Sequence, residues 1–250
     1  MGELGRRAEQ LPAGNRSVSR ALDILELLAH SERALGLAEV ARRLDLPKTS
    51  ALSLLRALHS RSFAALDEEG RYVLGLRSFE VGSVYLRRMT PVRVVESELR
   101  CLTDELMVTS HFAVLQGNDV VYLAKHDPPQ GVVRLASSLG ARLPAVSTAV
   151  GLAQLAHTGL PAEARTPSLL EQLAQVRQAG HAIDAGGTVR GIQCVAAPVF
   201  NATGCCGAIG ISHVQQGGPT TSVVVPAVRN AARRASAVLG GACPVPEAAV

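Results

Sequence analysis

The chain has 250 residues, enough for two ordinary domains, and its hydrophobic content of 47% can supply a substantial core. No apolar run reaches the length of a membrane span, and the first residues lack the apolar stretch of a signal peptide. We therefore expect a soluble cytoplasmic protein with no membrane partner. Five cysteines without a C-x-x-C pair disfavour a structural zinc site and a disulfide framework, so we expect no metal and no cofactor. The net charge of +4 is a weak indication of nucleic-acid binding.

A first helix is predicted to begin at Ser17, after a flexible arm formed by residues 1–16. The arm mixes charge, Gly and Pro without periodicity. The helix instead repeats apolar residues at the spacing of one helical face. These residues are Val18, Ala21, Leu22, Leu25, Leu28 and Ala29.

Residues 37–59 have the pattern of two short helices joined by a tight turn. Gly36 is a weak N-cap for the first helix, and Asp45, Leu46 and Pro47 interrupt the pattern before the second. Pro47 suits the first position of the second helix, because its φ is already helical and its missing N–H would be unpaired there. The apolar faces comprise Leu37, Val40, Ala41 and Leu44, then Ala51, Leu54, Leu55 and Leu58.

The opposite side of the second helix carries hydroxyls and cations and no carboxylate. Residues 40–61 hold several Lys and Arg side chains against one acidic residue, Asp45. Such a helix–turn–helix can enter the DNA major groove, whereas the alternative is a helical hairpin inside an enzyme. Residues 63–66 and 71–74 then predict a β-hairpin around an acidic loop, which would complete a winged helix–turn–helix; any surface β-turn is its alternative.

We expect the wing to place Arg71 near phosphate, with its acidic residues Asp67, Glu68 and Glu69 pointing away from DNA. The expected contacts to double-stranded operator DNA are made by Lys48, Thr49, Ser50, Leu52, Ser53, Arg56 and Arg71.

The second half of the chain alternates helices and short strands, which predicts an α+β sensor-like domain. Residues 76–88 form the expected linker helix, ending before Thr90 and Pro91, and a long amphipathic helix follows over 92–106. Strands are predicted at 111–116, 120–125, 132–136, 194–200 and 208–214, and helices at 147–157, 169–179 and 223–239.

The sequence resembles the IclR family of bacterial transcriptional regulators over about residues 17–240. The first matching block is SVSRALDILELLA with LAEVARRLDLPKTSALSLLRAL and GRYVLG. The second is GARLP at 140–144 with STAVG at 147–151, and the third is GHAID at 180–184 with GIQCVAAPVF at 191–200. Three blocks in the same order and at the family's spacing make the resemblance specific.

The resemblance implies a winged helix–turn–helix domain at 17–76, a linker helix at 77–90, a GAF-like effector-binding domain at 91–240 and a flexible tail at 241–250. Such proteins form homodimers or dimers of dimers, bind operator DNA, commonly as repressors, and respond to a small-molecule effector, a carboxylate or aromatic acid. Carried over by position, the effector-binding residues are Leu143, Ala149, Val150, Asp184, Cys194, Gly210 and Ser212.

This chain departs from the family at two places. Gly186 and Gly187 stand where acidic residues are usual, and Leu52 and Ser53 replace a common His-Arg pair in the recognition helix. The departures bear on the effector's chemistry and on the operator sequence, respectively.

The residues themselves also predict a ligand site in the second domain. Small residues around 145–151 open a helix whose N-terminal N–H groups suit a carboxylate, although N-capping by Ser147 explains the same residues. Cys194 has the character of a small buried hydrophobe. The alternative is a cysteine-dependent enzyme that uses Cys194, His181 and Asp184, but no motif builds an oxyanion hole there. An interaction adaptor would need no wing.

Overall fold

The computed structural model describes residues 15–129, 138–160, 164–186 and 189–242. The chain forms two compact units that divide between Tyr85 and Leu86, and each unit is described by itself. The strand predicted at 132–136 lies outside the described residues, as does nearly all of both expected tails, although Arg16 already belongs to the first helix.

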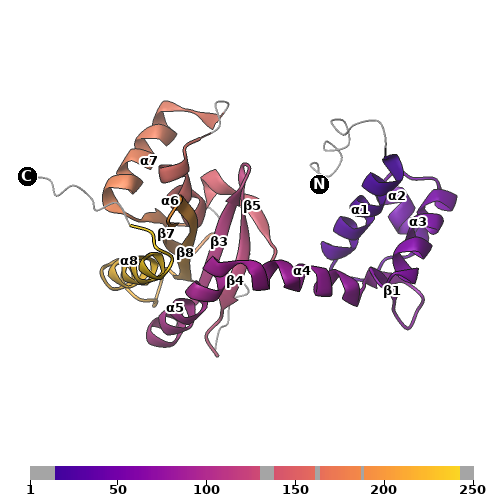
Figure 1. The fold of residues 1–250 in the computed structure, drawn as a ribbon, viewed down its shortest axis with the longest axis horizontal. Helices are drawn as coiled ribbons and strands as arrows, with labels where there is room; N and C mark the ends of the chain where they lie inside the picture. Colours follow the sequence, from indigo (N-terminus) through magenta and orange to yellow (C-terminus); the bar gives the residue numbers. More distant parts are fainter. Residues whose placement is uncertain (1–14, 130–137, 161–163, 187–188, 243–250) are drawn as a thin grey trace, which may run out of the picture. The chain divides into compact units, whose positions relative to one another are not determined.

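The N-terminal unit contains three helices and a two-stranded antiparallel hairpin (Figure 1). The helices are α1 (Arg16–Ala29), α2 (Leu37–Arg43) and α3 (Lys48–Ser60), and the strands are β1 (Ala64–Leu66) and β2 (Tyr72–Leu74). The apolar stripe predicted for α1 is wrong except at Leu28, because Ile24 and Leu27 enter the core whereas Val18 and Leu22 are more than half exposed. The apolar faces predicted for α2 and α3 do meet in one core, and the winged helix–turn–helix is confirmed. Its buried members are Ile24, Leu27, Leu28, Leu35, Val40, Leu55 and Ala64.

The turn between α2 and α3 differs from the prediction at Pro47. Asp45 adopts a left-handed conformation with φ of +50°, and Leu46 N–H bonds back to the carbonyl of Ala41 over 2.8 Å. Pro47 is the N-cap of α3 and not its first helical residue, because its ψ of 136° is extended. The extended residue redirects the chain into α3, while the Pro47 carbonyl accepts the N–H of Ala51.

Two helices follow the wing. Helix α4 (Leu76–Arg88) contains no buried residue, and the division between the two units falls inside it. Helix α5 (Thr90–Leu106) has Pro91 in its first turn and buries Val95 and Leu99.

The C-terminal unit is built on a six-stranded sheet in the order β5-β4-β3-β8-β7-β6, antiparallel at every pairing. The three-residue strands β5 and β6 at its two edges were not predicted. The strands are β3 (Thr109–Gln116), β4 (Asp119–His126), β5 (Arg142–Pro144), β6 (Ala182–Asp184), β7 (Ile192–Asn201) and β8 (Gly204–Val214).

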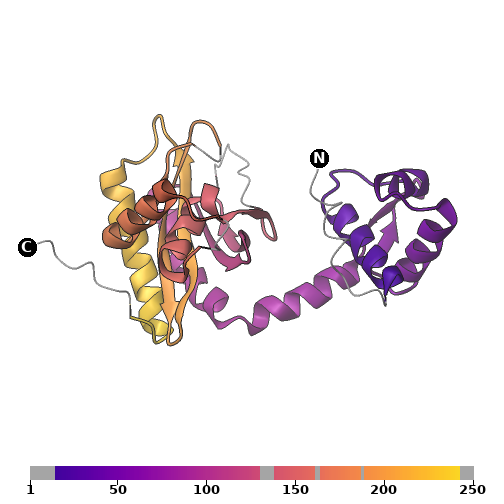
Figure 2. The same cartoon turned by 90° about the horizontal axis from the view of Figure 1, so that it is seen from above.

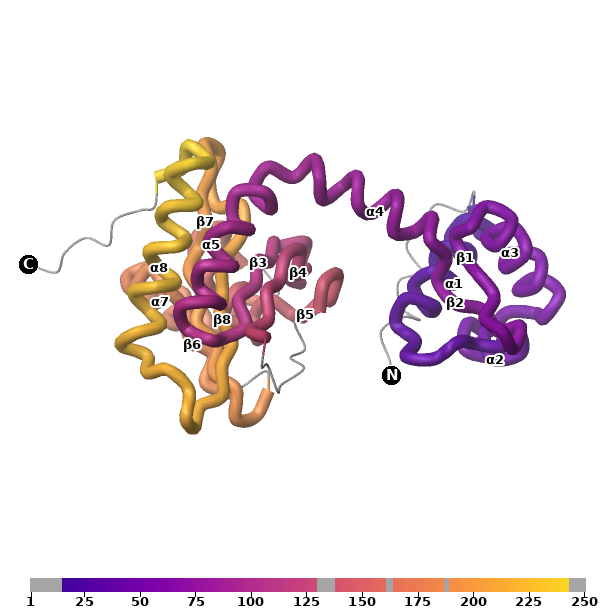
Figure 3. The backbone as a smooth tube through the Cα atoms, turned by 90° about the horizontal axis from the view of Figure 1, so that it is seen from below, coloured from indigo at the N-terminus to yellow at the C-terminus, as the bar shows by residue number. Residues whose placement is uncertain are grey.

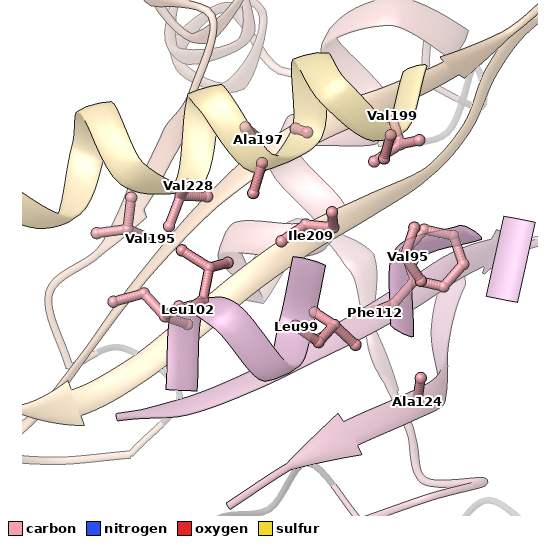
Figure 4. Close-up of a cluster of buried hydrophobic side chains, with 14 of the residues drawn as sticks. Val95, Leu99, Leu102, Phe112, Ala124, Val195, Ala197, Val199, Ile209 and Val228 are labelled. Carbon is pink, nitrogen blue, oxygen red and sulfur yellow. The ribbon is translucent and has the colours of Figure 1, made fainter. Parts of the chain in front are cut away.

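Helices cover both faces of this sheet. Helix α8 (Thr221–Val238) lies beside α5 on one face, as Figures 2 and 3 show, and α6 (Ala149–Thr158) covers the other and contacts α7 (Pro167–Ala179). Alternation along β8 separates two cores. Ile209 (Figure 4) packs towards α5 and α8, as does Ile211, whereas Ala208 packs towards α6.

Helix α6 begins two residues later than predicted. A 3-10 turn over Ala145–Ser147 precedes it, and Thr148 is the N-cap, because its Oγ1 accepts the N–H of Gly151 over 3.0 Å. Ser147 does not cap the helix; its hydroxyl donates to the carbonyl of Pro144. Gly151 is required here, since a Cβ would lie 2.0 Å from the carbonyl oxygen of Ala145.

The buried amide of Gln154 fixes α6 against the sheet. Its Oε1 accepts the N–H of Leu115 on β3 over 2.8 Å, and its Nε2 donates to the carbonyl of Val150 over 2.8 Å. At the other end of α6, Arg177 of α7 donates to the carbonyl of Ala156 over 2.6 Å.

Candidate functional site

Helix α3 has one side in the core and one side in solvent. Ala51 and Leu55 are fully buried. Of the seven predicted DNA-contacting residues, Lys48, Thr49, Ser53 and Arg56 are exposed, and Ser50, Leu52 and Arg71 are partly buried. The predicted polar face of α3 is therefore open to a partner.

Several cations near α3 carry an uncompensated charge. Glu39 pairs with Arg33 over 2.8 Å and with Arg43 over 2.6 Å, which neutralises both in part. By contrast, the other basic residues of α2, α3 and the following turn form no ion pair with any residue that the structure describes. These are Arg42, Lys48, Arg56 and Arg61, of which Arg42 and Arg61 were not predicted as contacts although the charge count over 40–61 included them.

Arg71 has a different environment from the one expected. It forms ion pairs with Asp67, over 3.0 Å, and with Glu69, and thereby closes the wing loop. Asp67 also accepts the backbone N–H groups of Arg71 and Glu69. The pKa of Asp67 is lowered chiefly by the hydrogen bond from the backbone N–H of Arg71, and further by the Arg71 guanidinium. The acidic residues of the wing thus hold Arg71, because residues 67 and 71 face each other across the loop.

The sheet of the C-terminal unit aligns three of the predicted effector-binding residues. The register pairs Asp184 of β6 with Cys194 of β7, and Cys194 with Ser212 of β8. The Cys194 Sγ and Ser212 Oγ atoms are 3.1 Å apart, within hydrogen-bond distance for sulfur. Cys194 packs with the core beneath α6, so this row of polar side chains lies on the sheet face that α6 covers.

The first turn of α6 lies directly on β8. A Cβ on Gly210 would be 2.8 Å from Val150 Cγ1, so only glycine permits this approach. Ala149 and Val150 are buried, and their N–H groups have no backbone acceptor within the described part of the chain. Leu143 of β5 packs against the same core. All seven predicted residues therefore belong to the sheet face under α6 or to α6 itself.

Two residues of this face were not predicted. The rings of His111 on β3 and Tyr122 on β4 meet edge to face with centroids 5.2 Å apart. Burial, followed by the charges of Cys194 and Asp184, raises the pKa of Tyr122 well above its usual value, which places its hydroxyl near the polar row. The signal that could have found His111 is its position two residues before buried Ala113 on the same strand.

The described geometry does not assemble the cysteine-dependent alternative. Burial raises the pKa of the Cys194 thiol, which the hydrogen bond from Ser212 opposes only in part, so the thiolate is disfavoured. His181 contacts the carbonyl of Ala179, whereas the side-chain partner of Cys194 among the described residues is Ser212. No cluster of three or more His, Cys, Asp or Glu suited to a metal occurs within residues 15–129, 138–160, 164–186 and 189–242. None of the described helices is long and apolar enough to cross a membrane.

Two curated regulators align with most of the chain. The HTH-type transcriptional regulator XynR of Escherichia coli K12 is 30% identical over 208 residues, covering 74% of this chain and 80% of XynR. The HTH-type transcriptional repressor AllR of the same strain is 27% identical, with 96% of both chains covered.

Solved structures share the fold. An IclR transcriptional regulator from Alicyclobacillus acidocaldarius is 28% identical with a TM-score of 0.75, covering 90% of this chain and 98% of that one. An IclR homologue from Microbacterium hydrocarbonoxydans, solved in complex with 4-hydroxybenzoate, has a TM-score of 0.77 at 21% identity, covering 89% and 98%.

Family models account for both units. The IclR helix-turn-helix domain matches residues 17–68, and the C-terminal domain of the bacterial transcriptional regulator IclR matches residues 83–165 and 162–237. With its helix–turn–helix unit and its α+β unit both matched, the chain belongs to the IclR family of DNA-binding transcriptional regulators.

Proposed function

We propose that this regulator represses transcription by binding a pseudo-palindromic operator through α3, and that a small carboxylate bound in the C-terminal unit changes that binding. The observation that carries the DNA-binding part is the exposed, carboxylate-free face of α3, whose cations pair with no carboxylate that the structure describes. Cations there neutralise phosphates, while Arg can also bind a guanine edge in two places. We assign contacts to Lys48, Thr49, Ser50, Leu52, Ser53 and Arg56, and a lesser one to Arg71.

The effector site is assigned to the sheet face beneath α6. Two N–H groups at the start of a buried helix, those of Ala149 and Val150, suit a carboxylate. Ser212 and Asp184 would bind the ligand's polar substituent, with Cys194 between them. Leu143 and Gly210 complete the proposed site. The 4-hydroxybenzoate complex of the Microbacterium homologue supports an aromatic acid as one ligand class.

A second copy of the chain is the proposed partner of α4. This helix buries no residue and exposes an apolar surface that water disfavours. A homodimer that covers this surface would also match the two halves of a pseudo-palindrome, and pairing of dimers is a further step. The exposed apolar residues are Leu76, Phe79, Val81, Val84 and Tyr85.

The proposed C-terminal site binds its ligand without converting it. A buried thiol with a raised pKa and no paired base is a poor nucleophile, so we assign Cys194 to the lining of the site. We propose no cofactor and no metal for this function, and we place it in the cytoplasm, where operator DNA is available.

The test combines a thermal-shift screen with gel shifts. Glyoxylate, pyruvate, benzoate and 4-hydroxybenzoate are screened against the full chain, and any acid that raises the melting temperature is added to a gel shift on the DNA upstream of its own gene. We expect at least one acid to stabilise the protein and to change operator binding. Stabilisation by none of them would contradict the proposed effector class, and turnover of a bound acid would contradict a binding-only site.

A further inference from the structure

His111 is held rigidly in the proposed effector site. Its side chain is almost completely buried, with 2% of the residue exposed. Tyr122 contacts one side of the ring edge to face. A Cβ on Gly210, its register partner on β8, would lie 2.6 Å from His111 Nε2. The missing Cβ therefore gives the imidazole its space.

One nitrogen of the His111 ring, Nδ1, lacks a hydrogen-bond partner among the residues that the structure describes. Nδ1 of His111 is fully buried and forms no hydrogen bond with any residue that the structure describes. Burial, with the nearby charge of Lys125, lowers the pKa of His111 to about 3, against a smaller opposing effect of Asp127, so the ring is neutral near pH 7. A neutral imidazole has one donor and one acceptor, and leaving either unpaired in the interior destabilises a protein.

The position of His111 distinguishes it from other buried histidines. Two other histidines also have a ring nitrogen without a partner among the described residues. His157 contacts Phe200 edge to face but lies near the far end of α6, and His213 follows Ser212 on β8 and so points to the opposite face of the sheet. Nε2 of His111 and Cγ1 of Val150 instead both lie close to the position that a Cβ on Gly210 would occupy. The ring is thus next to the first turn of α6, whose N–H groups are assigned to the ligand carboxylate.

The sheet register brings the polar row close to the same ring. Ser212 pairs with Thr109, two residues before His111 on β3, so Ser212 is a diagonal neighbour of His111 on one face of the sheet. A ligand between α6 and the polar row would therefore lie beside the imidazole.

We propose that His111 is a specificity-determining residue of the effector site, because the bound acid supplies the oxygen partner that the buried Nδ1 lacks among the described residues. The proposal rests on the proposed function and names the chemistry of the same site. In the free protein this ring nitrogen stays buried without a hydrogen bond among the described residues. The ligand carboxylate, bound by the N–H groups of α6 and by His111, supplies that hydrogen bond.

The first experiment measures stability without any ligand. His111→Leu replaces the imidazole with an apolar side chain of similar size, so calorimetry of the full chain should show a midpoint raised by about 2–4 °C. A lowered midpoint would mean that the imidazole stabilises the free protein through its packing or an unseen partner, and it would overturn the proposal.

The second experiment measures binding of the acid that stabilises the parent most among glyoxylate, pyruvate, benzoate and 4-hydroxybenzoate. We expect His111→Leu to lose at least about tenfold in affinity, the size expected for one lost hydrogen bond to a charged group. His111→Gln, which keeps a donor and an acceptor, should restore most of that affinity, and the control His157→Leu should bind like the parent.

The outcomes separate the two hypotheses. If the parent binds an acid and His111→Leu binds it equally well, the assignment of His111 is overturned while the proposed function stands. If the parent binds none of the four acids, the proposed effector class fails and the assignment of His111 fails with it.

Discussion

Arg56 and Arg71 carry the same charged group in two different environments. Arg56 is exposed on α3 and forms no ion pair within the described part of the chain, whereas Arg71 is engaged by Asp67 and Glu69. The sequence alone could not predict this difference, because both arginines lie on elements that were predicted to face DNA. The two side chains should therefore contribute unequally to operator binding.

Arg56→Ala should weaken operator binding by about 1–3 kcal/mol, if Arg56 makes a bidentate base contact, and should leave the fold intact. Arg71→Ala should cost less affinity, because its guanidinium is already paired. Fluorescence anisotropy with operator DNA measures both, with Arg77→Ala on α4 as the control. Unchanged affinity for Arg56→Ala would show that the DNA-binding face of α3 is assigned wrongly.

Ser212 and Asp184 provide the test of the polar row. Ser212→Ala or Asp184→Ala should reduce the affinity for a stabilising acid by about tenfold or more, since each would remove a hydrogen bond to the ligand. Operator binding without the acid should persist, because the N-terminal unit has its own core. Isothermal titration of both variants checks this, and Ser147→Ala, an exposed residue outside the row, serves as the control. Parent-like affinity in both variants would place the ligand elsewhere.

At the scale of elements, a turn signal located the short hairpin strands β1 and β2, whereas the short edge strands β5 and β6 were missed. The apolar faces of α2 and α3 could be located without coordinates, whereas the stripe assigned to α1 lies on the wrong side, since Ile24 and Leu27 are buried and Val18 and Leu22 are exposed. Strands β5 and β6 have three residues each, too few to show an alternation. The cap of α6 required geometry, because Ser147 and Thr148 are both good N-caps and only Thr148 has an extended backbone there.

The sequence predicted only part of the candidate site. Resemblance to the family located Cys194, Gly210 and Ser212, which the register then placed together. His111 was missed because its role depends on pairing with Gly210, almost a hundred positions away in the sequence, and such long-range contacts leave no local pattern.

The wing depends on a glycine between β2 and α4 that packs against the turn after α3. A Cβ at Gly75 would lie 2.2 Å from the carbonyl oxygen of Ser62, so Gly75→Ala should destabilise the N-terminal unit by about 1–3 kcal/mol. Gly82→Ala in α4 meets nothing within 4 Å and should stabilise its helix by about 0.5–1 kcal/mol. Urea unfolding of both variants measures the difference; equal stabilities would contradict the tight contact.

At the scale of the whole molecule, charge distribution matters more than net charge. The total of +4 is modest, yet Arg42, Lys48, Arg56 and Arg61 form no ion pairs with described residues around α3. Binding should therefore release counterions, and a dimer that contacts 6–10 phosphates should lose roughly 10³–10⁵-fold in affinity between 50 and 200 mM salt. Anisotropy titrations across this range, with a scrambled duplex as the control, measure the slope. A salt-independent affinity would exclude phosphate contacts as the main source of binding.

The two hydrogen bonds of the Gln154 amide restrict how α6 can move. Sliding along the helix axis would break its bond to Leu115, whereas tilting about Gln154 would preserve it. Ala149, in the first turn of α6, lies about 7.5 Å from Gln154 along the helix axis, at about 1.5 Å per residue. On the C-terminal side of Gln154, Arg177 of α7 donates a hydrogen bond to the carbonyl of Ala156. A ligand that displaces Ala149 would therefore tilt α6 about Gln154 and move the C-terminal end of α6 against α7.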